Sequence, residues 1–104
     1  MSRTYGGHDA RLTKAIRSAA FGGSVGWRPH AEDQMDDRGV THEEVWTCLK
    51  KGQAYGPEQI DGELRANVEH AGIHVRVVVA CLNVEDGDLT QLQELDVVTV
   101  IRTK

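Results

Sequence analysis

The sequence predicts an α+β domain in which two or three N-terminal helices pack on one face of an antiparallel sheet of three or four strands. Apolar residues recur at helical spacing in the first half of the chain. From residue 63 onward they alternate with polar residues, which is typical of strands with one buried face. The length of 104 residues, with 39% hydrophobic and 27% charged residues, fits one domain, 1–104, with one core. Within it we expect a basic helical segment (1–28), two further helices (29–52) and the sheet (53–104).

The first helix is expected to run from Asp9 to Ala20. Its apolar residues fall on one side of a helical wheel, and the basic residues Arg11, Lys14 and Arg17 fall on the other. The glycine-rich stretch "FGGSVG" that follows is a poor helix former and ends the helix.

Two more helices are predicted by their end signals. The second begins at Pro29, which suits a first helical turn, and stops before Gly39. The third has Thr41 as its N-cap and Glu44 three residues later, which together form a capping box, and it ends at Gly52.

Three strands are expected, over residues 63–69, 72–82 and 95–103, with a turn at 85–88 before the last. Pairing the apolar faces of the first two strands predicts a hairpin with its turn at residues 70–71. This register places Arg65 opposite Arg76, and Asn67 opposite His74.

Two arginines directly opposite each other repel, so the predicted register needs a compensating charge. One interpretation is a phosphate clamp, in which Arg65 and Arg76 hold an anion beside Asn67 and His74. The other is that Glu63 or Glu69 neutralises the arginines at a solvated surface.

The charge is unevenly distributed along the chain. The formal net charge is -4, but residues 1–28 carry five bases and one acid, whereas residues 29–64 carry nine acids and three bases. We therefore expect the basic first segment, through Arg11, Lys14 and Arg17, to contact an anionic partner. The acidic second segment could instead dock a basic protein.

The second helix carries a polar stripe of unusual composition. His30, Gln34 and Arg38 follow one another at steps of four residues, so they lie on one side of the helix. A histidine near a helix N-terminus with acidic neighbours suits proton transfer. The alternative is that His30 only orients the helix and that Arg38 pairs with Glu43 or Asp37.

We expect a cytoplasmic protein with no membrane segment, because the first residues contain no apolar signal region and the chain contains no long uncharged run. Cys48 and Cys81 both sit in apolar patterns and are expected to be reduced. No cysteine and histidine spacing indicates a metal site, and no glycine loop indicates a phosphate-binding cofactor.

A motif in the two middle helices resembles a known family. Its residues are His30-Ala31, Met35, Arg38-Gly39-Val40-Thr41, Glu44-Val45, Leu49 and Gly52. In this order they are similar to the signature of the DUF4258 family of small bacterial proteins, and more distantly to the RelE, BrnT and MqsR toxins of the barnase–EndoU–colicin–RelE superfamily. The motif spans about twenty-five residues, and the order of elements agrees over about residues 28–103.

The resemblance implies a RelE-like fold and a metal-independent endoribonuclease of a bacterial toxin–antitoxin or effector system. It implicates His30 and Arg38 directly, and Arg65, Arg76 and Thr99 by their strand positions. RNA cleavage needs a base, an acid and cations on the phosphate, and His30 or His74 could be the base or the acid. The implied partners are RNA, including ribosome-bound mRNA, and an antitoxin or immunity protein. The alternative is an inactive acidic module that binds another protein.

Overall fold

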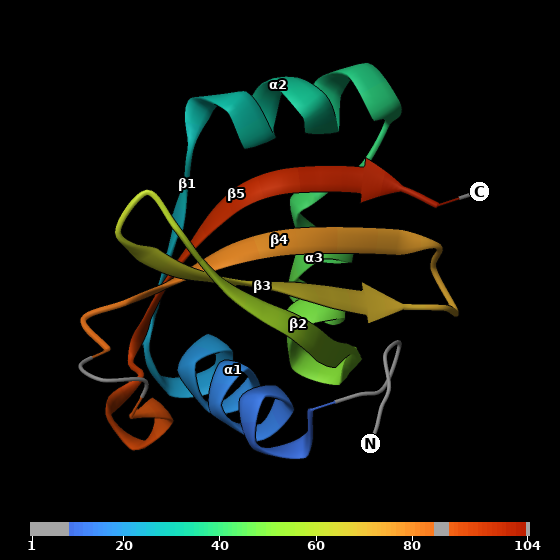
Figure 1. The fold of residues 1–104 in the computed structure, drawn as a ribbon. Helices are drawn as coiled ribbons and strands as arrows, with labels where there is room; N and C mark the ends of the chain where they lie inside the picture. The colour runs from blue at the N-terminus through green and yellow to red at the C-terminus, as the bar shows by residue number, and fades with distance from the viewer. Residues whose placement is uncertain (1–8, 85–87, 104) are drawn as a thin grey trace.

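The computed structural model describes residues 9–84 and 88–103, so the first eight residues of the basic segment and most of the turn predicted at 85–88 lie outside the described residues. The elements in chain order are α1 (Ala10–Gly22), β1 (Ser24–Trp27), α2 (Pro29–Arg38), α3 (His42–Lys51), β2 (Gln53–Ile60), β3 (Glu63–His70), β4 (Val75–Leu82), the short 3-10 helix η1 (Leu89–Gln91) and β5 (Glu94–Arg102). The predicted α+β class is confirmed, with three α-helices on one sheet (Figure 1).

The sheet is larger than predicted and is mixed. It has five strands in the order β1-β5-β4-β3-β2, in which β1 runs parallel to β5 and the other neighbours are antiparallel. The prediction omitted β1, because its glycines indicated a break, and β2. Glycine suits position 26 of β1, because a Cβ there would lie 2.4 Å from Oδ1 of Asp96 on the neighbouring strand.

The helices α1 and α3 cover one face of the sheet, and α2 lies along β5 (Figure 1). The core lies between the two covering helices and the sheet. Its fully buried side chains include Leu12 and Ile16 of α1, Val45 and Leu49 of α3, and Val77 of β4. The opposite face of the sheet has no helix packed on it in the part of the chain that the structure describes, and we call it the open face.

The ends of α2 and α3 follow the predicted signals, whereas α1 continues two residues beyond its expected end, to Gly22. Pro29 occupies the first turn of α2, and Gly39 ends that helix in the left-handed conformation with φ 65°. Thr41 and Glu44 form the capping box of α3, since each side chain accepts the backbone N–H of the other residue. Asp9 caps α1 by accepting the backbone N–H of Leu12 at 3.0 Å.

The predicted hairpin exists between β3 and β4, but its register was wrong by four residues along β4. Leu64 pairs with Cys81 and not with Val77, and the turn lies between His70 and Val75. A shift by an even number of residues keeps every side chain on its predicted face, so alternation alone could not distinguish the two registers.

Candidate functional site

The polar stripe of α2 closes the exposed edge of β5. The strand β1 pairs only with the first half of β5, which leaves the backbone of Val100 without a strand neighbour on that side. Gln34 Oε1 accepts the Val100 N–H at 2.8 Å, and Arg38 Nη1 donates to the Val100 carbonyl at 2.6 Å. These two side chains therefore supply the hydrogen bonds that a neighbouring strand would make.

This arrangement gives Arg38 a structural role that the sequence did not predict. Its hydrogen bond goes to a backbone carbonyl, rather than to Glu43 or Asp37. Arg102 reinforces the contact by donating to the carbonyls of Arg38 and Gly39 at 3.2 and 2.8 Å, where α2 ends.

The two candidate histidines lie in different parts of the structure, His30 in the first turn of α2 and His74 in the turn that precedes β4. His30 is exposed and follows Arg28, whose N–H bonds the Val97 carbonyl. His74 is exposed in the turn before β4, with φ 53°, and its carbonyl accepts the N–H of Thr103. The structure therefore does not bring His30 and His74 together, and the predicted pairing of His74 with Asn67 was wrong, because Val78 lies opposite Asn67.

Arg65 belongs to an ion network that crosses the open face. Arg28 donates from Nε to Asp96 at 3.0 Å and from Nη1 to Glu63 at 2.9 Å, and Arg65 Nη2 donates to the same Glu63 at 2.8 Å. Ala80 lies between Asp96 and Arg65 in the sheet and is fully buried, so these side chains must cover it.

The network neutralises Arg65. Hydrogen bonds from Arg28 and then from Arg65 lower the pKa of Glu63 to about 2, and the same carboxylate raises the pKa of Arg28. Glu63 thus takes the neutralising role that was the alternative to a phosphate clamp. Arg65 also lies opposite Ala80, so the predicted contact with Arg76 was wrong.

Arg76 occupies a different environment on the same face. It lies opposite Glu69 on β3 and Ile101 on β5, and its guanidinium forms no ion pair within 4.0 Å among the described residues. Its Nε is buried and has no hydrogen-bond partner in residues 9–84 and 88–103. A buried donor without a partner is costly, which makes Arg76 the described open-face arginine best suited to receive an anion.

The residues around Arg76 come from four adjacent strands. Thr99 and Asn67 both lie opposite Val78, and the Tyr55 hydroxyl is 3.4 Å from Glu69 Oε1. We call Tyr55, Asn67, Glu69, Arg76 and Thr99 the open-face cluster. It contains a carboxylate, a phenol, a guanidinium, an amide and a hydroxyl, all half-buried.

Tyr55 was not among the residues predicted from the sequence, and Glu69 was expected only to neutralise the arginines. Tyr55 lies in β2, which was not predicted, and Glu69 faces Arg76 only in the observed register. A signal for that register was present, because it pairs opposite charges where the predicted register paired two arginines.

The basic residues of α1 line the outer surface of that helix, on the layer away from the open face. Arg11 and Lys14 are exposed, whereas Arg17 donates from Nη2 to the carbonyls of Lys51 and Gly52 at 3.1 and 2.8 Å, where α3 ends. Two surface hollows of about 650 and 640 Å³ flank this helix, and Lys14 lines both.

The cysteines are remote from this chemistry. Cys48 and Cys81 are free and buried, and burial raises the pKa of their thiols to about 12 and about 11. Among residues 9–84 and 88–103, no group of three or more histidine, cysteine or acidic residues could hold a metal ion, and no helix is both long and apolar enough to cross a membrane.

Fold and site together define an α+β protein with a mixed five-stranded sheet and a polar cluster on the open face. Comparison with protein-family models, curated proteins and solved structures finds no match to this chain. The resemblance to the DUF4258 and RelE-like proteins therefore stays a prediction that rests on its motif residues.

Proposed function

We propose that this chain is a metal-independent endoribonuclease of the toxin type that binds RNA across the open face of its sheet. The observation that carries the proposal is Arg76, a guanidinium among strand residues with an unpartnered Nε and no carboxylate in ion-pair contact among the described residues. Arginine is well suited to hold a phosphate because its donors match the phosphate oxygens.

The open-face cluster offers the groups that RNA cleavage without a metal needs. Glu69 would take the proton of the 2′-hydroxyl, whose oxygen then attacks the adjacent phosphorus. Arg76 would stabilise the negative charge that develops on the phosphoryl oxygens. Tyr55 would donate a proton to the departing 5′-oxygen, so the products are a 2′,3′-cyclic phosphate and a 5′-hydroxyl end.

Thr99 and Asn67 would orient the RNA in this proposal. They flank Val78 on the two neighbouring strands, so a hydroxyl and an amide stand on either side of the strand that carries Arg76. His30 is the competing candidate for the base, because the motif implicates it and its side chain is exposed. Arg38 keeps the structural role that its bond to Val100 gives it.

The test is to induce the protein in a bacterial host and to follow growth and RNA integrity, with purified protein and RNA as the second assay. We expect wild type to arrest growth and cleave RNA. Losing one acid–base group typically costs about 10²- to 10⁴-fold in rate, so Glu69→Gln should lower cleavage by this range, and Arg76→Ala should also lower it strongly.

Glu58→Gln is the matched control for Glu69→Gln. Glu58 is an exposed acid of β2 outside the cluster, so the variant makes the same change of charge and should cleave as wild type does. Full activity of Glu69→Gln with loss in His30→Ala would move the base to His30. Intact RNA under strong induction of wild type would end the ribonuclease proposal.

A second candidate rests on the acidic surface of α2 and the start of α3. Glu32, Asp33, Asp36, Asp37 and Glu43 are all exposed there. In this alternative the chain is an inactive antitoxin, immunity or inhibitor protein that docks a basic partner. It predicts a harmless protein whose complex with that partner dissociates at high salt and is lost when these acids are neutralised.

A further inference from the structure

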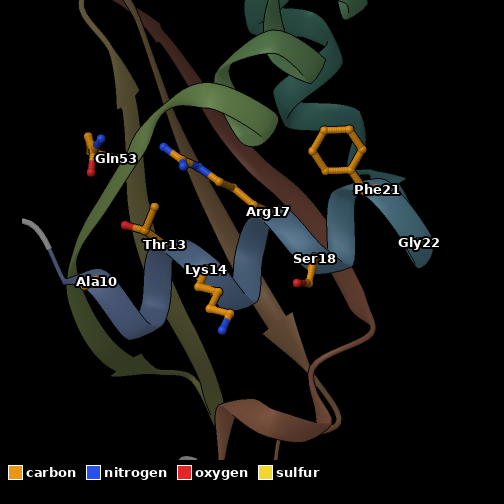
Figure 2. A pocket seen from close by; sticks show the side chains of 8 residues that line it. All are labelled: Ala10, Thr13, Lys14, Arg17, Ser18, Phe21, Gly22 and Gln53. Atoms are coloured by element: carbon orange, nitrogen blue, oxygen red, sulfur yellow. The ribbon is translucent and has the colours of Figure 1, made fainter.

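One of the two hollows beside α1, lined by Lys14 and Arg17, has the chemistry of a nucleic-acid site. It has a volume of about 650 Å³ and lies between α1 and the start of β2. Figure 2 shows Lys14, Arg17, Ser18 and Phe21 projecting from α1, with Gln53 of β2 across from them. Lys14, Ser18 and Phe21 follow one another at steps of four and three residues, so they lie along one side of the helix.

Positive charge at this hollow is not neutralised by described acids. No carboxylate lines it, and Lys14 and Arg17 form no ion pair with any described residue. Among the described residues Arg17 donates to backbone carbonyls alone and its buried Nε has no partner, so no described carboxylate compensates its charge. At the end of α3, the Lys50 ammonium lies over the Phe21 ring, and the Lys51 backbone carbonyl accepts from Arg17, so the last turn of that helix brings two more basic residues to the rim of the hollow.

Phe21 adds an aromatic surface to these cations. Its side chain is 70% exposed, and it is the one large hydrophobic residue exposed in the part of the chain described here. Lys50 Nζ lies 5.0 Å from the centroid of its ring and 4.9 Å from that of Trp46. An exposed ring beside several cations is the combination with which proteins bind single strands, because bases stack on the ring while cations contact phosphates.

We propose that this hollow binds single-stranded RNA, with an unpaired base stacked on Phe21 and the backbone held by Lys14, Arg17 and Lys51. This site is separate from the open-face cluster, on the layer of the molecule that carries α1. Gln53 connects the two surfaces, since it lines the hollow and its backbone pairs with Glu69. The idea that the same RNA strand continues from the hollow to the open-face cluster rests on the proposed function. Binding of RNA at the hollow does not.

The test measures binding by fluorescence anisotropy with a labelled 2′-O-methyl RNA, which lacks the free 2′-hydroxyl and so cannot be cleaved by the proposed mechanism. Stacking of one base is expected to account for about 5- to 150-fold in affinity, so Phe21→Ala should weaken binding by this range and Phe21→Tyr should not. Each removed phosphate contact should reduce the salt slope by about 0.7, so Lys14→Gln and Lys51→Gln should both flatten it.

Two comparisons make the result specific. Gln59→Glu changes the net charge as Lys14→Gln does, at an exposed position of β2 outside the hollow, and should bind as wild type does. Wild type should prefer the single strand to the same sequence in a duplex, and Phe21→Ala should lose that preference, because paired bases cannot stack on the ring.

Affinities of Phe21→Ala and Lys14→Gln within twofold of wild type would overturn the proposal. It would also be overturned if a polyglutamate peptide displaced the RNA at equal concentration, since the surface would then be a dock for an acidic protein. Because the probe is not a substrate, binding without cleavage of ordinary RNA would remove the proposed ribonuclease function and leave this site standing. Cleavage of ordinary RNA without binding of the probe would remove this site and leave the proposed ribonuclease function standing.

Discussion

Gln34 and Val100 are 66 residues apart in the chain and are joined by a hydrogen bond of 2.8 Å from the backbone N–H of Val100 to the side-chain oxygen of Gln34. The contact occurs where β5 extends beyond its short partner β1. A free strand edge invites pairing with other chains, and proteins commonly cover such edges. Here one helix covers the edge with a side-chain acceptor and, through Arg38, a side-chain donor.

This relationship predicts that the stripe of α2 contributes mainly to stability. Gln34→Ala would leave the N–H of Val100 without its partner, and Arg38→Ala would do the same to the carbonyl. We expect each to lower the free energy of unfolding by about 1 kcal/mol or more. His30→Ala, at an exposed position on the same stripe, should change it by less than about 0.5 kcal/mol. Urea unfolding measures the free energy of unfolding of all three variants. An equal loss in the three would show that α2 does not seal the edge of β5.

A second prediction concerns the pH dependence of the ion network. The pKa of Glu63 falls from an ordinary value of 4.5 to about 2 because of its bonds to Arg28 and Arg65. A carboxyl whose pKa is lowered on folding stabilises the fold above its unfolded pKa, and this contribution is lost as the pH falls through the folded value. The difference in unfolding free energy between wild type and Glu63→Gln should therefore be full above about pH 5 and shrink toward pH 2.

Glu58→Gln is the control for that experiment, because Glu58 lies opposite Arg65 on β2 but is exposed and forms no ion pair with any described residue. The difference in unfolding free energy between Glu58→Gln and wild type should stay small over the same pH range. A Glu63→Gln difference that does not vary with pH would show that the network contributes no charge-dependent stability.

The two helix-end glycines should respond oppositely to alanine. Gly39 has a φ of 65°, so Gly39→Ala forces a side chain into the left-handed region and should destabilise by about 1 kcal/mol. Gly22 is the last residue of α1, and a Cβ there would meet nothing within 4 Å. Gly22→Ala should be neutral or stabilising by about 0.5 kcal/mol, because alanine is the better helix former. Thermal unfolding of the two variants checks the pair.

The buried thiols should be inert in the folded protein. The raised pKa values of Cys48 and Cys81, about 12 and about 11, leave almost no thiolate at pH 8, and burial excludes the reagent. An aromatic disulfide reagent should detect both thiols in denaturant and neither on the same timescale without it. Fast reaction of one thiol in native buffer would reveal a local opening of the core around it.

The sequence by itself determined the elements whose signals are local. Pro29, Gly39, Thr41 and Glu44 fixed the ends of α2 and α3, because a cap depends on residues three or four positions apart. The alternation in β3 and β4 likewise fixed which side chains face the helices. These features gave the α+β class and assigned Arg65, Arg76 and Thr99 to their strands.

The tertiary structure decided everything that depends on residues distant in the chain. The position of β1 beside β5, the bond of Arg38 to Val100, and the ion pair between Arg28 and Glu63 each join residues more than 30 positions apart. The hairpin register also belongs here, since two registers that differ by an even shift bury the same faces. Alternation cannot choose between them, although the pairing of opposite charges favours the observed register. That register has a four-residue turn before β4, packs its strands against α3 and places Glu69, and not Arg65, opposite Arg76.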